Sequence, residues 1–386
     1  MQAKTVKVDI IGAIASINAL IIAFLIANKK NKTTSDYILI AWVINFALHF
    51  ATPFFIERHV FFHESTWGFI MAVFVVAHAP FIFVYANSLT NPKFKVNFKN
   101  LYHFGAILIF IAGFIPYFTL NQEERLNLAL QKEGLSFYMF LPLILLLFIR
   151  LYFFIRTIIV VINFQYRIKQ SFSYEKEINL AWLRRIVIGF FVIILLSFIL
   201  YALASAKIIA IYVLDYVAIV ANMILFFFIA YSGYKQNAIQ EVISGTDQTE
   251  SKLKTEVKTK PVQEIAKSGS TDNHDPVIIE LQQLMDREKL YLEPELNIGN
   301  IANQLNVHAH QLSKLINCQL EKNFFEFVNE YRVEEFKKLA TNPKNKHISI
   351  LGLAMEAGFN SKSTFNRFFK NSTGLTPTEF MESYKF

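Results

Sequence analysis

Apolar runs of about 20 residues recur through the first 234 residues of the chain and limit what it can fold into. A helix of ~20 apolar residues spans the ~30 Å hydrocarbon core of a bilayer. Hydrophobic residues make up 54% of the chain and charged residues 18%, too few to cover a soluble protein of this size with polar surface. The seven runs cover about residues 6–27, 36–56, 67–89, 101–118, 137–163, 182–205 and 208–232. We therefore predict an all-α fold that begins with a seven-helix transmembrane bundle, residues 1–234.

The first apolar run resembles a signal peptide only at its start. Lys4 and Lys7 precede it, as basic residues precede the apolar segment of a signal peptide. The run is longer than the roughly 7–15 apolar residues of such segments, and no clear small-x-small cleavage site follows it. We expect it to remain as a membrane anchor.

Lys and Arg are concentrated in alternate connections between the runs. The rich connections hold Lys29, Lys30 and Lys32, then Lys93, Lys95 and Lys99, then Arg167, Lys169 and Lys176. The connections between them hold one or two basic residues each. Because cytoplasmic connections carry the excess of Lys and Arg, we predict a multi-pass protein of the inner (plasma) membrane. Its N-terminus is expected outside, and residues after 235 in the cytoplasm.

Three charged residues lie well inside the apolar runs, away from their ends: Arg150, Arg156 and Asp215. Charges inside a bilayer are costly and often functional. The alternative is that both arginines extend toward the cytoplasmic face while Asp215 stays hydrated near the outer face. An Arg150–Asp215 pair inside the bundle is a further option, although their expected depths differ.

His59 and His63 lie four residues apart in the connection 57–66. On a helix this spacing can hold a metal ion, with Glu57 or Glu64 as a further ligand. The alternative is two solvated histidines, which is the interpretation we adopt, so no metal or other cofactor is predicted.

Residues 235–276 change in composition to Lys, Thr, Glu, Ser and Gln, with few aromatic residues. Such a segment cannot bury enough apolar surface to become ordered. We predict a flexible cytoplasmic linker. Its 33 residues from 244 to 276 have a root-mean-square reach of roughly 30 Å as a flexible coil.

After Pro276 the apolar spacing becomes helical, and two stretches share one pattern. In the first, a short helix near 298–305 is followed by a turn at Asn306-Val307 and a second helix with Leu312 and Ile316 inward. In the second, Ile350, Leu353 and Ala354 precede a turn at Gly358, and Phe365, Phe368 and Phe369 lie inward in the helix that follows. A short helix, a tight turn and a second helix form a helix-turn-helix, whose second helix enters the major groove of DNA.

A single helix, Asn323 to Ala340, is predicted between the two units. Gly358 suits a turn position with φ > 0, and Ser361 or Asn360 is expected to cap the helix after it. At 1.5 Å per residue the bridging helix spans about 27 Å, against ~34 Å between successive major grooves on one face of DNA. One rigid helix can therefore hold two recognition helices for adjacent grooves.

Five segments of this region together resemble a known family. In chain order they are NIGNIANQLNV, LSKLIN at 312–317, NFFEFVNEYRV at 323–333, GFNSKSTFNRFFK at 358–370 and GLTPTEF at 374–380. Residues 277–386 thereby resemble the DNA-binding domain of AraC/XylS-type transcriptional regulators, in the arrangement where it follows a multi-span membrane region. The resemblance implies a tandem helix-turn-helix domain that binds double-stranded DNA.

The family's groove-facing positions fall on the second helix of each unit. In this sequence they are His310, Ser313 and Lys314, then Lys362, Ser363, Asn366 and Arg367. Arg367 has the chemistry for bidentate pairing with guanine, and Asn366 with adenine. Lys314, Lys362 and Lys370 are expected to contact phosphates, whereas Arg332 is expected to be buried and structural.

The charge of this domain is unevenly divided. Residues 277–386 hold 13 basic and 13 acidic side chains; up to residue 335 there are 5 basic and 10 acidic, and after it 8 and 3. The second unit should therefore supply most of the attraction to phosphates, and one copy should bind weakly. We expect a homodimer, with RNA polymerase as a further candidate partner.

Signatures of catalysis are absent from the sequence: it contains no H-E-x-x-H, G-x-S-x-G, Walker or glycine-rich dinucleotide motif. We predict a membrane-bound transcriptional regulator, not an enzyme, that couples an unknown signal ligand to promoter binding. Two alternatives stay open. One is a membrane transporter or enzyme with an autoregulatory DNA-binding appendage, and the other is an interaction adaptor with a decayed DNA-binding domain.

Overall fold

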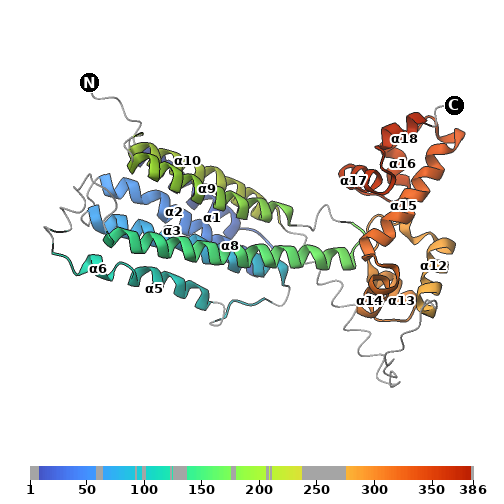
Figure 1. The fold of residues 1–386 in the computed structure, drawn as a ribbon, viewed down its shortest axis with the longest axis horizontal. Helices are drawn as coiled ribbons and strands as arrows, with labels where there is room; N and C mark the ends of the chain where they lie inside the picture. The colour runs from blue at the N-terminus through green and yellow to red at the C-terminus, as the bar shows by residue number, and fades with distance from the viewer. Residues whose placement is uncertain are drawn as a thin grey trace, which may run out of the picture. The chain divides into compact units, whose positions relative to one another are not determined.

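The computed structural model describes residues 8–57, 64–91, 94–97, 101–121, 124, 137–174, 180–205, 208, 211–236 and 275–383. These residues form helices joined by turns, with one isolated β-bridge and no strand among them (Figure 1). The chain divides into two compact units, residues 1–162 with 180–237, and residues 163–179 with 238–386. The predicted linker, 235–276, lies outside the described residues except for two positions at each end.

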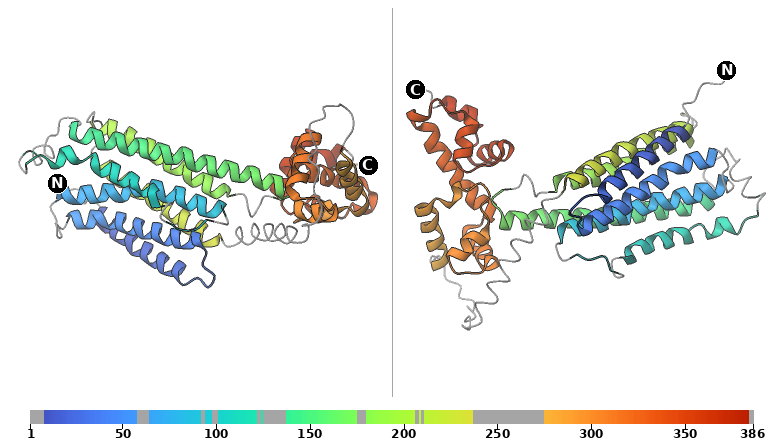
Figure 2. Two further views of the ribbon diagram at one scale, coloured as in Figure 1. Left: turned by 90° about the horizontal axis from the view of Figure 1, so that it is seen from below. Right: turned by 180° about the vertical axis from the view of Figure 1, so that it is seen from behind.

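Six long helices build the first unit and run side by side (Figures 1 and 2). They are α1 (Val8–Ala27), α2 (Thr34–Glu57), α3 (Glu64–Thr90), α8 (Phe137–Ser171, whose last residues belong to the second unit), α9 (Ala181–Ser205) and α10 (Ile211–Lys235). Each contains a stretch of at least 19 residues that is long and apolar enough to cross a bilayer. Six such helices in the described part of the chain indicate a membrane protein.

The fourth apolar run does not form one long helix, so the described residues contain six long spans and not the predicted seven. It forms η1 (Tyr102–Phe104), α5 (Gly105–Ala112) and α6 (Ile115–Phe118). Gly113 separates the last two, consistent with the weak helix propensity of glycine. Phe83 of α3 contacts His103, and Phe69 contacts Phe118. The broken segment therefore still runs antiparallel along α3.

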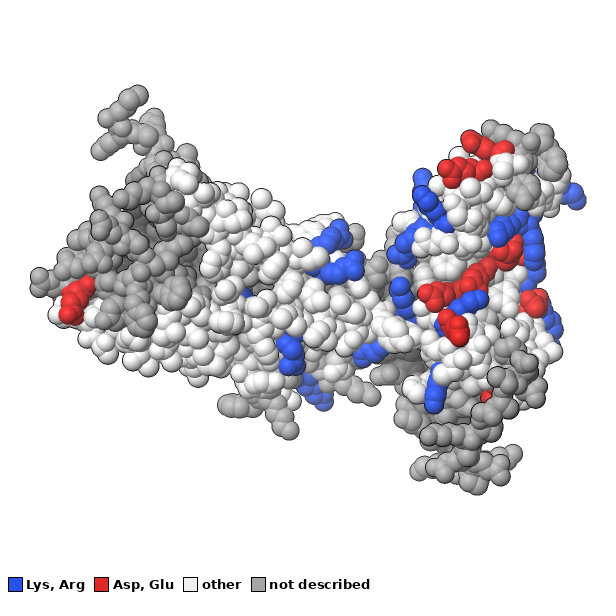
Figure 3. Space-filling view, in the orientation of Figure 1, with Lys and Arg blue, Asp and Glu red and all other residues white. Residues whose placement is uncertain are grey.

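The outside of the bundle is apolar. Phe24, Leu108 and Ile224 are each at least two-thirds exposed, whereas Trp42 and Phe46 are fully buried among other aromatic rings. Figure 3 shows a wide uncharged surface on this unit, with basic side chains toward one of its ends. A soluble protein rarely exposes an apolar patch of this extent, so this surface matches contact with lipid.

Small residues allow α1 to approach α2 closely. Ala15, Ala19 and Ala23 are buried at intervals of four on one face of α1. Gly12 precedes them, and a Cβ atom at Gly12 would overlap the backbone oxygen of Phe50. Close backbone approach through small residues stabilises helix pairs in membranes, where the hydrophobic effect between helices is absent.

The second unit is built around one long helix, α15 (Phe324–Thr341), with shorter helices at both of its ends (Figure 1). The other elements are α12 (Pro276–Glu288), η2 (Leu290–Leu292), α13 (Ile298–Gln304), α14 (Ala309–Leu320), η3 (Pro343–Asn345), α16 (Ile350–Glu356), α17 (Lys362–Thr373) and α18 (Pro377–Ser383). Phe324 and Val328 of α15 belong to a core with α13 and α14, and Val333 and Phe336 to a core with α16 and α17. One helix thus supports two helix-turn-helix units.

Candidate nucleic-acid interface

In the first helix-turn-helix unit, α13 and α14 meet at the turn expected from the sequence. Asn306 takes a left-handed conformation with φ 52°, a region that Asn tolerates better than most residues. Leu312 and Ile316 of α14 are fully buried. Among the three predicted groove-facing residues of α14, His310 and Lys314 are exposed and Ser313 is half-buried.

In the second unit, a glycine turn and a side-chain cap set the start of α17. Gly358 has φ 94°, and the Ser361 side chain accepts a hydrogen bond from the Thr364 backbone N–H at 3.5 Å. Phe365 and Phe369 are buried against α15 and α16. The turn, the Ser361 cap and these two core positions agree with the sequence prediction.

The four predicted groove-facing residues of α17 are all exposed. They are Lys362, Ser363, Asn366 and Arg367. Residues at i, i+1, i+4 and i+5 share one helix face, and this face is opposite to Phe368 and buried Phe365. The face carries two cations, an amide and a hydroxyl, which suit phosphate oxygens and base edges.

Helix α15 is held at its start by a reciprocal cap. The Asn323 side chain accepts from the Glu326 N–H at 2.9 Å, and the Glu326 carboxylate accepts from the Asn323 N–H at 3.1 Å. The 18 residues of α15 give it a length of about 27 Å. A helix of this length, capped and shared by both cores, can keep α14 and α17 at a fixed separation.

Arg332 on α15 is 1% exposed, in agreement with the predicted structural role. Its Nε donates to the Tyr291 backbone oxygen at 2.8 Å, and its Nη2 donates to that of Glu293 at 2.7 Å. Burial lowers the pKa of the guanidinium to about 9, so it is still protonated at neutral pH. Its hydrogen bonds to carbonyl oxygens compensate for the lost hydration.

The end of α8 and the residues that follow it belong to the second unit and contact Arg332. Ser173 is fully buried, and its backbone oxygen accepts from Arg332 Nη1 at 3.0 Å and from Asn329 Nδ2 at 3.2 Å. Its hydroxyl accepts from Arg332 Nη2 at 3.0 Å and donates to the Leu296 oxygen at 2.7 Å. We call residues 170–174 the docking segment. Their sequence predicted only a connection between two apolar runs, and this contact was not expected.

Within the docking segment, Gln170 covers part of the first recognition helix. Ser313 Oγ donates to Gln170 Oε1 at 3.0 Å, and Asn317 Nδ2 donates to the same oxygen at 2.5 Å. Gln170 Nε2 donates to Asn317 Oδ1 at 3.2 Å. Ser313 is therefore occupied by a residue of the same chain, which explains why it is only half-exposed.

The charge on this unit is uneven in space as well as in sequence. Figure 3 shows acidic side chains along the middle of the unit, over α15, with basic side chains on both sides of them. Glu335, for example, accepts from Lys289 Nζ at 3.1 Å and from the Tyr291 hydroxyl at 3.2 Å. Burial and, after it, the Glu335 charge raise the pKa of Tyr291 to about 12. The Glu335 carboxylate therefore stabilises the fold of this unit through its bonds to Lys289 and Tyr291.

The other residues singled out in the sequence lie in the first unit. His59 and His63 are outside the described residues, and no cluster of metal ligands occurs in the described ranges. Arg156 of α8 is exposed and donates to the Tyr152 hydroxyl at 3.2 Å. Asp215 lies on α10, but its side chain is outside the described part, so the Arg150–Asp215 pair stays a prediction.

Comparisons with known proteins support the assignment of the C-terminal fold. A family model described as a helix-turn-helix domain matches residues 301–383, which hold α14, α15, α16 and α17. No curated protein and no solved structure matched the chain. The chain therefore carries an AraC-type helix-turn-helix domain of DNA-binding transcription regulators, joined to an N-terminal membrane-type region of six long apolar helices.

Proposed function

We propose that this chain is a membrane-bound transcriptional regulator that couples a signal received in the bundle to sequence-specific promoter binding. The observation that carries the proposal is the pair of helices α14 and α17, on which all the predicted groove-facing residues except Ser313 are exposed, while one helix, α15, links them. In this proposal Asn366 and Arg367 contact base edges, His310 and Ser313 add base contacts from α14, and Lys314 and Lys362 contact phosphates. Ser363 adds a hydroxyl beside them.

The proposed location is the inner (plasma) membrane, with the N-terminus outside and the DNA-binding domain in the cytoplasm. The support is the excess of Lys and Arg in alternate connections, which marks the cytoplasmic side. Lys29 in the first of these forms an ion pair with Asp36 at 2.7 Å. Residues 235–276 then serve as the linker between domain 1–234 and domain 277–386.

Helix α8 supplies a continuous connection from the bundle to the DNA-binding domain. It is helical from Phe137 to Ser171, and its last residues belong to the second unit. The docking segment, which begins with the last two residues of α8, holds the backbone of Ser173 against Arg332 and Asn329. In this proposal α8, whose last residues contact α14, carries the signal from the bundle toward the DNA-binding domain.

Pairing of two copies is part of the proposal. The domain has equal numbers of basic and acidic residues, and its basic excess is confined to the part after residue 335. One copy then gains little from counterion release, whereas two tethered copies bind a paired site with a raised effective concentration. RNA polymerase is the partner that activation of transcription would require.

Replacing Gln170 with Ala in the full chain should tighten DNA binding by about 3- to 10-fold. The side chain makes three hydrogen bonds to α14. The one from Ser313, which contributes about 0.5–1.5 kcal/mol, must break before DNA can contact Ser313. The affinity would be measured with the protein in nanodiscs. Tyr166→Ala, at an exposed position on the same part of α8, is the matched control. Unchanged affinity in Gln170→Ala would show that Gln170 does not compete with DNA.

The proposed function is tested by selecting bound sequences from a library of random DNA duplexes, with the full chain in nanodiscs. We expect a defined site, to which Arg367→Ala binds about 10- to 100-fold more weakly, because a bidentate base contact contributes about 1–3 kcal/mol. Lys344→Ala, an exposed lysine of η3 away from both recognition helices, should bind as the unchanged protein does. Failure to enrich any sequence contradicts the proposal and favours the adaptor alternative, to which the zero net charge of the domain points.

A further inference from the structure

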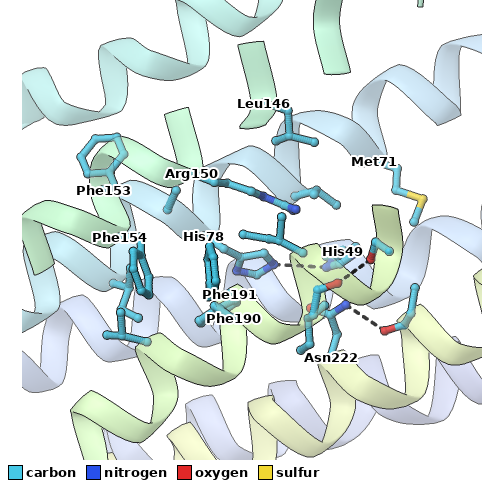
Figure 4. Close-up of a pocket in the computed structure, with 18 residues that line it drawn as sticks. His49, Met71, His78, Leu146, Arg150, Phe153, Phe154, Phe190, Phe191 and Asn222 are labelled. Atoms are coloured by element: carbon cyan, nitrogen blue, oxygen red, sulfur yellow. Dashed lines mark hydrogen bonds between the residues drawn. The ribbon is translucent and has the colours of Figure 1, made fainter. Parts of the chain in front are cut away.

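A cavity of about 190 Å³ lies inside the bundle, lined by residues of α2, α3, α8, α9 and α10. Its wall is mostly aliphatic and aromatic, as at Leu146, Phe153, Phe190 and Ile194 (Figure 4). An apolar cavity of ~150 Å³ is large enough to hold benzene. The space therefore fits a small organic molecule with an apolar body.

Two histidines in the cavity wall form a directed chain of hydrogen bonds. The Trp42 indole N–H donates to His78 Nδ1 at 3.1 Å, and Asn45 Nδ2 lies 3.2 Å from the same nitrogen. Because His78 Nδ1 accepts, its hydrogen is on Nε2, which lies 3.2 Å from His49 Nδ1. His49 Nδ1 then accepts in turn, and its remaining hydrogen is on Nε2. The chain thus ends in an N–H donor of His49 for which no acceptor occurs among the described residues.

Arg150 of α8 extends toward these two histidines (Figure 4). Its guanidinium makes no hydrogen bond or ion pair with any residue in the described ranges. Isolated charges in an apolar interior are costly unless an opposite charge or hydrogen-bond acceptors compensate them. Arg156, six residues further along α8, differs because it contacts the Tyr152 hydroxyl and lies over the Phe83 ring at 5.3 Å.

We propose that this cavity binds a small monocarboxylate with an aromatic or short aliphatic body. The guanidinium of Arg150 has the fork of donors that pairs with both oxygens of a carboxylate. The donor of His49 adds a neutral hydrogen bond, and the apolar wall takes the body of the ligand. The lining residues include the cation Arg150 and no carboxylate, so an anion is favoured over a cation.

This ligand is also the candidate signal, a role that rests on the proposed function. Arg150 lies on α8, and the last residues of α8 belong to the docking segment. In that segment Ser173 accepts a hydrogen bond from Arg332, and Gln170 contacts α14. Pairing of Arg150 with an anion would change the position of α8 that is favoured within the bundle. The site itself does not depend on this role and can be tested without DNA.

The test measures binding by calorimetry to the full chain in phosphatidylcholine nanodiscs, with benzoate and hexanoate as probes and benzamide and hexanamide as their uncharged counterparts. We expect saturable binding of the carboxylates and at least about 10-fold weaker binding of the amides. Arg150→Leu should weaken carboxylate binding about 10- to 100-fold, and Arg150→Lys should retain part of it. Arg156→Leu, on the same helix, should bind as the unchanged protein does.

Several results would overturn the site. Equal binding of amides and carboxylates, or normal binding by an Arg150→Leu protein, would show that Arg150 holds no carboxylate. Displacement of benzoate by chloride at the same concentration would show that the cavity is a site for simple anions. Loss of benzoate binding in nanodiscs that contain phosphatidylglycerol would assign the cavity to a lipid headgroup. Thermal unfolding checks that the Arg150→Leu protein is folded, as expected when an unpaired charge is removed. If the carboxylate binds but leaves DNA affinity unchanged, the site stands and its signal role is wrong.

Discussion

Replacing Arg332 with Met should destabilise the DNA-binding domain by about 3–5 kcal/mol, the range seen when one partner of a buried charged network is removed. Met fills a similar space, but it removes the donor to the Tyr291 backbone oxygen and one of the two donors to each of the Ser173 and Glu293 oxygens. Each buried acceptor left unpaired costs about 1–3 kcal/mol. The same change also removes the guanidinium that holds the docking segment.

Hydrogen exchange of the amides of α15 in the full chain measures this loss as a fall in the free energy of local opening. Arg287→Met is the matched control, because the Arg287 side chain is 76% exposed and pairs with its neighbour Glu288. We expect the control to change stability by no more than about 0.5 kcal/mol. A similarly small effect of Arg332→Met would contradict the role of Arg332 as the centre of this network.

Replacing Gly358 with Ala should cost about 3 kcal/mol or more. The residue has φ 94°, where a side chain adds backbone strain of about 1–2 kcal/mol. The new Cβ would also overlap the Tyr291 backbone oxygen and lie 3.0 Å from Arg332 Nε, and overpacking of this kind typically costs about 1–3 kcal/mol. The substitution therefore disturbs the turn before α17 and the Arg332 network together.

Gly374→Ala separates the two contributions to this effect. Gly374 has φ 78°, but a Cβ there would meet no atom within 4 Å. We expect a loss of about 1–2 kcal/mol, from backbone strain alone. Thermal unfolding of both variants gives the comparison, and equal losses would show that close packing at Gly358 contributes nothing.

The tandem helix-turn-helix was predictable because its determinants are local. The glycine turn, the Ser361 cap and the phenylalanine spacing of α17 lie within 12 residues of one another, and local rules fix their conformation. The short helices of the fourth apolar run were missed, although Gly113 and Pro116 mark a weak point in it. The prediction of one long helix rested on the length and apolar composition of the run and gave too little weight to its helix-breaking residues.

The link from α8 to the DNA-binding domain could not be read from sequence. Ser173 and Arg332 are 159 positions apart. Nothing in the sequence around a serine at the end of a membrane helix indicates which distant residue it will contact. The burial of Arg332 was predicted from its place in the bridging helix, but its acceptors were not. For the same reason, the half-burial of Ser313 by Gln170 was beyond prediction from α14 alone. Pairing of His49 with His78, 29 positions apart, likewise depends on how α2 and α3 pack.

The salt dependence of DNA binding by the full chain in nanodiscs tests the central claim most directly. If the chain is a DNA-binding regulator, the logarithm of the binding constant should fall linearly with the logarithm of the salt concentration, by about 0.9 per phosphate contact. Lys362→Ala should weaken binding to all sequences and reduce this slope by about 1. Binding that is absent, or insensitive to salt, would contradict the claim.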